Sequence, residues 1–289
     1  MSKNLYMKKI GERAKFAALN LCNLNINKRN SVLKQFNLYL KTNEKAILIA
    51  NKKDIERAKS KKIKDSMIDR LKLNSKKILQ IRNSIKKIIK FKDPVGKILS
   101  SWKRPNGLII KKVTIPIGVI GVIYESRPNV TSDVSALCFK SGNVVILRGG
   151  SEAYYSNKIL AKLFKMALKK KKCDENCVQF VENRNRNHVD YLLSNMKNYV
   201  DLIIPRGGKS LVKKVLKKSS VSIVGHYEGL CHVFVDRQAN LDTAVKIVKN
   251  SKMRNVSIFN ELYTVFITFF LFKSFSKKFS YNLIRIISF

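Results

Sequence analysis

Apolar residues recur every three or four positions along the first 93 residues, which is the spacing of one face of an α-helix. This pattern predicts helices over 12–24, 30–59 and 66–91. Asn30 or Ser31 is the expected N-cap of the second helix. The sequence "DPVG" at 93–96 then interrupts the pattern, because Pro and Gly break helices.

The pattern changes at 97–115, where two runs of alternating apolar and polar residues flank a turn. The turn contains Asn106-Gly107, a pair typical of tight hairpins, so we predict a β-hairpin. A hairpin that projects from an α/β body is suited to oligomerisation. A surface hairpin without a partner explains the pattern equally well.

From residue 116 short apolar runs rich in β-branched residues alternate with helical segments. The predicted strands are 117–125, 143–149, 178–182, 200–205, 221–226 and 231–236. The predicted helices are 131–140, 151–172, 187–197, 207–218 and 240–252. Alternation of this kind favours an α/β fold with a doubly wound parallel sheet covered on both faces.

Two predicted strands end in glycine directly before a helix, in "LRGG" at 147–150 and in "PRGG" at 205–208. Glycine at this point lets backbone N–H groups approach a phosphate at the helix N-terminus. Neither turn has the G-x-G-x-x-G spacing, and a tight turn without a ligand also explains each.

The chain carries 59 Lys and Arg against 19 Asp and Glu, a net charge of +40, which raises the possibility of a nucleic-acid-binding protein. The lysines are spread over all helical segments and are rarely interleaved with aromatic residues. Lys, Asn and Ile are all abundant, so we favour drift in an A+T-rich gene. Nucleic-acid binding stays an alternative, which one dominant positive face would support.

Five cysteines at irregular spacing, without an apolar leader segment, indicate reduced thiols and a cytoplasmic protein. The lone "CDENC" pair does not predict a zinc site, and we expect no metal. Cys231 and His232 are adjacent in a predicted strand and therefore point to opposite faces, which argues against a nucleophilic pair. The apolar run 262–272 is too short to span a membrane.

The run "YESRPNVTSD" at 124–133, followed by "CFKSGNVVILRGGSEA" at 138–153, resembles the gamma-glutamyl phosphate reductases of the aldehyde dehydrogenase superfamily. The resemblance extends over residues 5–267. It implies that 1–226 holds N-terminal helices, the hairpin arm and an NADP-binding domain, and that 227–289 begins a catalytic domain.

That family reduces L-glutamyl 5-phosphate with NADPH to glutamate 5-semialdehyde and phosphate, in the second step of proline biosynthesis. The resemblance implies a cysteine thiolate that forms a thioester, and fixed donors for the oxyanion. It also implies NADP(H) as cofactor and glutamyl 5-phosphate as substrate. From the patterns described above we expect no specific nucleic acid and no membrane as partner, and a homo-oligomer through the hairpin arm is one possibility.

The resemblance also assigns candidate site residues. Those expected near the adenosine ribose are Arg148, Gly149, Gly150 and Glu152, the arginine being suited to the extra phosphate of NADP. Those expected near the pyrophosphate are Pro205, Arg206, Gly207 and Gly208. Asn129 matches the oxyanion-hole asparagine, although a turn asparagine before a helix is the alternative, and Arg127 is a candidate for binding the anionic substrate.

The family's nucleophile motif aligns without a gap to "NSKMRNVSIFNELYTVFI" at 250–267, and Phe259 stands where the cysteine belongs. Because phenylalanine cannot form a thioester, we expect this chain to be inactive. An inactive remnant that binds NADP(H) or pairs with a partner chain is the alternative function.

From about residue 268 the sequence no longer resembles the family and reads like out-of-frame translation. The expectation is a C-terminally truncated, degenerate family member whose exposed sheet edges make it poorly soluble.

Overall fold

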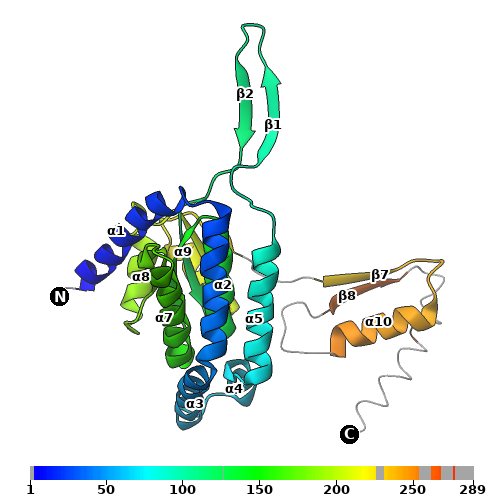
Figure 1. Cartoon of the computed structure of the whole chain (residues 1–289). Helices are drawn as coiled ribbons and strands as arrows, with labels where there is room; N and C mark the ends of the chain where they lie inside the picture. Colours follow the sequence, from blue (N-terminus) through cyan, green and yellow to red (C-terminus); the bar gives the residue numbers. More distant parts are fainter. Residues whose placement is uncertain (1–2, 126, 226–230, 254–261, 268–275, 277–289) are drawn as a thin grey trace. The chain divides into compact units, whose positions relative to one another are not determined.

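The computed structural model describes residues 3–125, 127–225, 231–253, 262–267 and 276 (Figure 1). The chain divides into two compact units, Met1–Gly225 and His226–Phe289, which are described separately below. Every helix in the described part of the chain is too short or too polar to cross a membrane.

The N-terminal segment is helical, as predicted, but two of the predicted helices are each divided into two. The observed helices are α1 Lys3–Leu21, α2 Ile26–Thr42, α3 Glu44–Ser60, α4 Asp65–Leu71 and α5 Ser75–Lys90. Asn43 separates α2 from α3, and Asn74 caps α5 by accepting a hydrogen bond from Lys77 N–H at 2.8 Å. Asparagine competes for backbone hydrogen bonds, which explains why helices end and begin at these positions.

The predicted N-cap of the second helix is wrong. Asn25 caps α2, since its side chain accepts from Lys28 N–H at 2.9 Å. Asn30 and Ser31 lie inside the helix, and the Asn30 side chain instead accepts from Lys140 Nζ at 2.7 Å.

A four-stranded parallel sheet forms the centre of the first unit and confirms the α/β prediction. Its strands are β3 Val119–Tyr124, β4 Val144–Gly149, β5 Val178–Phe180 and β6 Leu202–Arg206, in the order β5-β4-β3-β6. All residues of β3, β4 and β5 are buried, as expected for strands covered on both faces.

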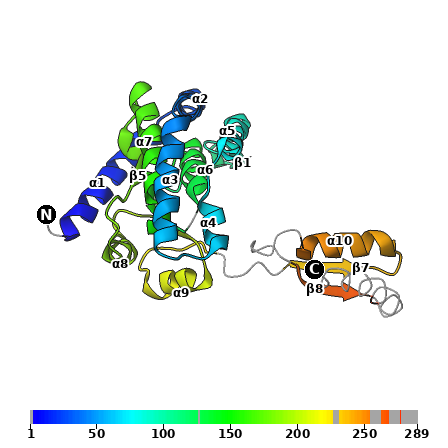
Figure 2. The same ribbon diagram turned by 90° about the horizontal axis from the view of Figure 1, so that it is seen from below.

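Helices cover both faces of this sheet (Figure 2). The connecting elements are α6 Pro128–Lys140, η1 Ser151–Ala153, α7 Tyr154–Lys170, η2 Glu175–Cys177, α8 Asn187–Ser194 and α9 Lys209–Lys218. One face is packed by α6 and α7, with α2 and α5 outside them, and the other by α1 and α8. Phe164 of α7 lies between Phe36 of α2 and Phe139 of α6, at ring-centroid distances of 4.6 and 5.7 Å. These three rings form the centre of the helical layer that contains α6 and α7.

The strand predicted over 221–226 is not observed in its described residues, 221–225. Only a single parallel bridge joins Ile223 to Ile203 of β6. The Ser219 hydroxyl accepts from Val221 N–H at 3.1 Å and donates to Val221 O at 2.8 Å. These bonds occupy backbone groups that would otherwise pair with a neighbouring strand.

The strand order reverses at β3. From β3 the chain proceeds to β4 and β5 on one side and then returns to place β6 on the other side. In open parallel sheets the carboxyl ends of the strands on either side of such a reversal border a crevice, which is the usual place for a ligand.

The predicted hairpin is confirmed as β1 Ile98–Lys103 paired antiparallel with β2 Ile109–Val113 (Figure 1). Gly107 adopts a φ of 86° in the turn, a conformation that favours glycine. Several apolar side chains of the hairpin and its base are exposed in this unit: Ile98, Leu99, Trp102, Leu108, Ile109, Val113 and Ile115. Because an isolated two-stranded hairpin is only marginally stable, this arm needs a stable attachment.

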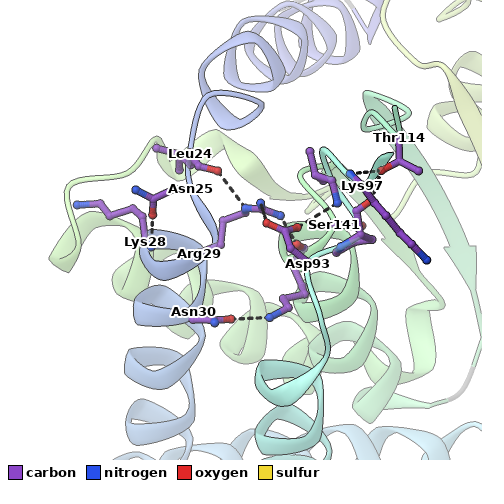
Figure 3. A network of polar contacts seen from close by, with 12 residues as sticks. Leu24, Asn25, Lys28, Arg29, Asn30, Asp93, Lys97, Thr114 and Ser141 are labelled. Atoms are coloured by element: carbon purple, nitrogen blue, oxygen red, sulfur yellow. Dashed lines mark hydrogen bonds and ion pairs between the residues drawn. The ribbon is translucent and has the colours of Figure 1, made fainter. Parts of the chain in front are cut away.

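A polar network attaches the base of the hairpin to the helices (Figure 3). Arg29 of α2 is only 2% exposed, and it donates to Asp93 Oδ2 at 2.7 Å, to Leu24 O at 3.1 Å and to Lys140 O. The Lys140 ammonium in turn donates to Ile89 O at 2.9 Å. The network therefore joins the α1–α2 turn, the end of α5 and the end of α6.

Hydrogen bonds continue this network into the hairpin. Asp93 Oδ1 accepts from Val95 N–H at 3.0 Å, and Thr114 Oγ1 accepts from Lys97 N–H at 2.9 Å (Figure 3). The base of the hairpin is therefore attached to the helices through Asp93, which joins the buried Arg29 to the backbone at Val95.

The second unit contains β7 Cys231–Val235, α10 Leu241–Met253 and β8 Leu262–Ile267. The predicted strand at 231–236 and helix at 240–252 are confirmed. The strands pair in parallel, and Val245 and Val248 of α10 pack with Val235 in a small apolar cluster. Phe259 lies outside the described residues, in the connection before β8.

We expect Arg29→Met to lower the free energy of unfolding by about 3 kcal/mol, because removing one partner of a buried ion pair leaves the other groups unpaired. Thermal or urea unfolding of the purified chain measures this. Lys52→Met, which removes an exposed lysine 3.9 Å from Glu56, is the control and should cause no measurable change. Equal unfolding midpoints for the two variants would contradict the anchoring role of Arg29.

Candidate functional site

A cavity of 510 Å³ lies at the carboxyl ends of β3 and β4, next to the reversal of strand order. Its volume is within the usual range for small-molecule sites. Four elements provide most of its wall: the ends of β3 and β4 with their turns, the loop after β5, and α9. The lining residues are Ile63, Met67, Ile123, Tyr124, Glu125, Arg148, Gly149, Gly150, Ser151, Glu152, Arg184, Arg186, Val189, Ser210, Leu211 and Lys214.

The turn after β4 brings backbone and side chains too close together for any residue larger than glycine. A Cβ atom at Gly149 would meet the Asn157 amide and would lie 3.1 Å from the Tyr124 ring. At Gly150 it would meet the carboxyl group of Glu152. Gly150 N–H also donates to Tyr124 O at 2.8 Å, which closes the turn against β3. Gly149 therefore lets the turn pack against Asn157 and Tyr124, and Gly150 leaves room for the Glu152 carboxyl group beside the backbone.

The Arg148 side chain is held inside the protein. It is 7% exposed, its Nη2 donates to Arg184 O at 3.0 Å and its Nη1 donates to Gly149 O. Burial lowers the pKa of this guanidinium, while the charge of Glu152 acts in the opposite direction. Arg148 therefore ties the loop after β5 to the turn after β4, and the Nε atom has no hydrogen-bond partner among the described residues.

The basic side chains that reach the cavity from other elements were not identified from the sequence. Arg184 and Arg186 lie on the exposed loop after β5, and Lys214 lies on α9. Arg184 is placed over the Tyr154 ring at 4.8 Å, a cation–π geometry. The sequence "ENRNR" directly after a buried strand could have revealed the two arginines. A positive loop at that point lies at the same end of the parallel sheet as the glycine turns.

The N-terminus of α7 is closed by side chains of α3. Asp54 accepts from Tyr155 N–H at 3.0 Å and from Ser156 N–H at 2.7 Å. Burial raises the pKa of Asp54, although these hydrogen bonds act against that change. Asn51 adds a hydrogen bond to Ser156 Oγ at 3.0 Å. Because protein groups already satisfy the first N–H groups of α7, this helix start does not offer an anion site.

The N-terminus of α9 is arranged differently, since the acceptor there is a side chain from the end of β3. Gly208 is the N-cap and has no side chain, and its N–H donates to Glu125 Oε2 at 2.9 Å. A Cβ atom at Gly207 would lie 2.6 Å from the same oxygen and 2.7 Å from Leu211 Cδ2. Glu125, which the sequence analysis missed, therefore occupies the place where an anion would bind at this helix start.

The other residues of "PRGG" belong to β6. Pro205 is buried opposite Ile123 of β3, and Arg206 lies opposite Tyr124. Arg206 O accepts from Glu125 N–H at 3.2 Å. These two residues hold the turn against β3, and neither lines the cavity.

Asn129 and Arg127 lie at the start of α6, next to a second, smaller cavity. Asn129 is within the first turn of the helix, where it donates to Asp133 Oδ2 at 3.1 Å, and Asn129 and Asp133 line a cavity of 320 Å³. Burial lowers the pKa of Arg127, and the charges of Arg70 and Arg206 lower it further. The basic residues that line the smaller cavity itself are Arg70, Lys72 and Lys77, and positive charge on its wall favours an anionic ligand.

Phe259 is a predicted site residue that lies outside the described residues. Within the described residues no group of three or more His, Cys, Asp or Glu side chains is arranged to hold a metal ion.

Comparison with known proteins connects these features to a family. The family model described as "Aldehyde dehydrogenase family" matches residues 3–256. The gamma-glutamyl phosphate reductase of a Nitratiruptor species is 43% identical over 258 residues, which are 89% of this chain and 62% of that protein. The crystal structure of gamma-glutamyl phosphate reductase from Thermotoga maritima has a TM-score of 0.91 at 36% identity, covering 96% of this chain and 67% of that one.

A more distant structure shows the fold alone. An engineered glycolyl-CoA reductase with bound NADP+ has a TM-score of 0.67 at 18% identity, covering 96% of this chain and 59% of that one. The chain thus spans 62% of the length of the curated relative named above. The match over most of the chain, together with the parallel sheet and its two glycine turns, shows that the chain belongs to the aldehyde dehydrogenase family.

Proposed function

We propose that this chain derives from a gamma-glutamyl phosphate reductase and binds NADPH in the larger cavity. The reaction is the reduction of L-glutamyl 5-phosphate to glutamate 5-semialdehyde with release of phosphate. The observation that carries the proposal is a cavity at the strand-order reversal, lined by the glycine turn after β4 and by α9, in a chain 43% identical to a reductase of that name. None of the matched proteins named above favours the nucleic-acid-binding alternative.

The residues of the larger cavity fit a dinucleotide phosphate. Gly149 and Gly150 leave room for close approach, and Glu152 presents a carboxylate suited to ribose hydroxyls. Arg184, Arg186 and Lys214 supply positive charge for phosphate groups. NADPH, when bound, supplies the hydride. We assign the preference for NADPH over NADH to Arg184 and Arg186 of the loop after β5. The buried Arg148 does not carry it.

The start of α6 is the proposed substrate end. Asn129 is the candidate donor to the developing oxyanion of the acyl group, and Arg127 beside it is the candidate for binding the negative charge of the phosphate. The hydrogen bond from Asn129 to Asp133 fixes the orientation of the amide.

The covalent step needs a thiolate, and Phe259 stands at the position of the cysteine in the alignment. We therefore propose that this chain binds cofactor without turning over substrate. The chain is then an inactive remnant that retains cofactor binding, and the identity of residue 259 is the observation that favours this.

We further propose that the hairpin of β1 and β2 pairs with another copy of the chain. Its apolar side chains are exposed in the described structure, and the Arg29 network fixes its base. An arm that holds apolar residues away from its own unit is suited to covering them on a partner.

The purified chain should not oxidise NADPH in the presence of freshly prepared glutamyl 5-phosphate. Absorbance at the NADPH band, read against a control without enzyme, measures this. A Phe259→Cys variant tests whether the missing nucleophile is the only defect. Oxidation by the unmodified chain would contradict the proposed inactivity.

Exchanging both loop arginines, Arg184→Gln with Arg186→Gln, should weaken NADPH binding about tenfold or more and leave NADH binding nearly unchanged. A hydrogen bond to a charged group contributes about 1.5–3 kcal/mol, and only NADPH carries the extra phosphate. Fluorescence titration with both cofactors measures the ratio. Arg104→Gln, on the hairpin turn, is the control; an equal loss for both cofactors would argue against the assignment of the loop.

Glu125→Gln should strengthen NADPH binding about fivefold, because the carboxylate on Gly208 N–H repels phosphate while the amide oxygen still accepts the hydrogen bond. The same titration measures it, with Glu175→Gln at the opposite edge of the sheet as the charge-matched control. Weaker binding in Glu125→Gln would show that the carboxylate holds the cofactor.

Ile109→Glu should convert an oligomer into a monomer, because it places a charge in the exposed apolar strand β2. Sedimentation velocity at micromolar concentration measures the mass, and Lys111→Glu on the same strand is the control. A monomeric unmodified chain would rule out pairing through the arm at that concentration.

A further inference from the structure

The smaller cavity is lined by a half-buried carboxylate, Asp133, one oxygen of which has no hydrogen-bond partner among the described residues. Helix α6 contributes Asn129 and Asp133 to the wall. The residues from the α4–α5 side are Arg70, Lys72, Leu73, Lys77, Gln80, Ile81 and Ser84. The carboxylate of Asp133 on one wall thus shares a cavity of 320 Å³ with three basic residues on the other wall.

The two oxygens of Asp133 have different environments. Oδ2 accepts from Asn129 Nδ2 at 3.1 Å, whereas Oδ1 is closed off from solvent and has no hydrogen-bond partner among the described residues. Burial raises the pKa of this carboxyl group, and the Asn129 hydrogen bond only partly offsets that effect. A buried acceptor without a donor is costly, so a rotation of the carboxyl group that brings Oδ1 to a donor in the adjoining cavity would be favourable.

The charges around Asp133 limit which donor fits. A free cation would be repelled by the lysines and the arginine of the opposite wall, and one carboxylate is too few ligands for a metal ion. A ligand that carries an ammonium group and a carboxylate on the same carbon meets both walls with opposite charges. Two of the lysines are already used locally, since Lys72 pairs with Asp69 at 2.7 Å and Lys77 donates to Lys72 O at 2.6 Å. They still contribute positive charge to that wall.

We propose that this cavity recognises the zwitterionic end of an α-amino acid, with Asp133 accepting the ammonium group and the α4–α5 wall facing the α-carboxylate. The proposal rests on the proposed function and names the part of the substrate that the family's reaction leaves unchanged. Asn129 lies between the two ends of such a substrate, because it contacts Asp133 and is the candidate donor to the reacting carbonyl. Asp133 is then a specificity residue that separates aminoacyl phosphates from simple acyl phosphates.

L-Glutamate and glutarate are matched probes, because they differ only in the ammonium group. Calorimetric titration of the full chain should give at least about tenfold tighter binding of glutamate than of glutarate, the expected effect of one charged hydrogen bond. In Asp133→Asn, which keeps the size of the side chain, the two affinities should become equal. Glu175→Gln removes one exposed carboxylate at the other edge of the sheet and should keep the preference.

Equal affinities of the unmodified chain for both probes would overturn the proposal, as would a preference that survives in Asp133→Asn. If Asp133→Asn does not fold, as thermal unfolding would show, the comparison of probes on the unmodified chain still decides. NADPH binding is measured separately in the larger cavity. Its absence together with a preference for glutamate would contradict the proposed cofactor role alone, and its presence without that preference would contradict this inference alone.

Discussion

The position of β3 in the middle of the parallel sheet is the constraint from which both candidate sites follow. Since β4 pairs with one edge of β3 and β6 with the other, the turns that follow all three strands come together at one end of the sheet. The glycine turn after β4 lines the larger cavity at that end, and Asp54 accepts hydrogen bonds from the first N–H groups of α7. The start of α9 is then left for an anion, where Glu125 now accepts the backbone hydrogen bond.

The sequence was sufficient for the class of fold and for most elements, because buried parallel strands leave continuous apolar runs between amphipathic helices. It failed where local polar hydrogen bonds decide the outcome. Asn43 divides the helix predicted over 30–59 and Asn25 caps the first part of it, while Ser219 bonds to the backbone where a strand was predicted. The glycine turns were identified from the strand–glycine–helix pattern, and the role expected of Asn129 came from the resemblance. Glu125, Arg184 and Asp133 were not identified, because their roles depend on contacts between residues far apart in the chain.

Charge is distributed unevenly between the interior and the surface. Three cations are buried in the described residues, and each holds separate segments together through hydrogen bonds: Arg29, Lys140 and Arg148. Most of the remaining basic residues lie on half-buried or exposed positions of helices, where compositional drift costs little stability. The few basic groups around the two cavities are therefore better candidates for function than the net charge of +40.

A crystal structure of the chain with NADPH tests the central claim most directly. We expect NADPH in the cavity at the carboxyl ends of β3 and β4, with its 2′-phosphate beside Arg184 and Arg186. We also expect Glu125 to be displaced from Gly208 N–H. A cofactor bound elsewhere, or one bound in this cavity while Glu125 keeps its hydrogen bond to Gly208, would contradict the central claim.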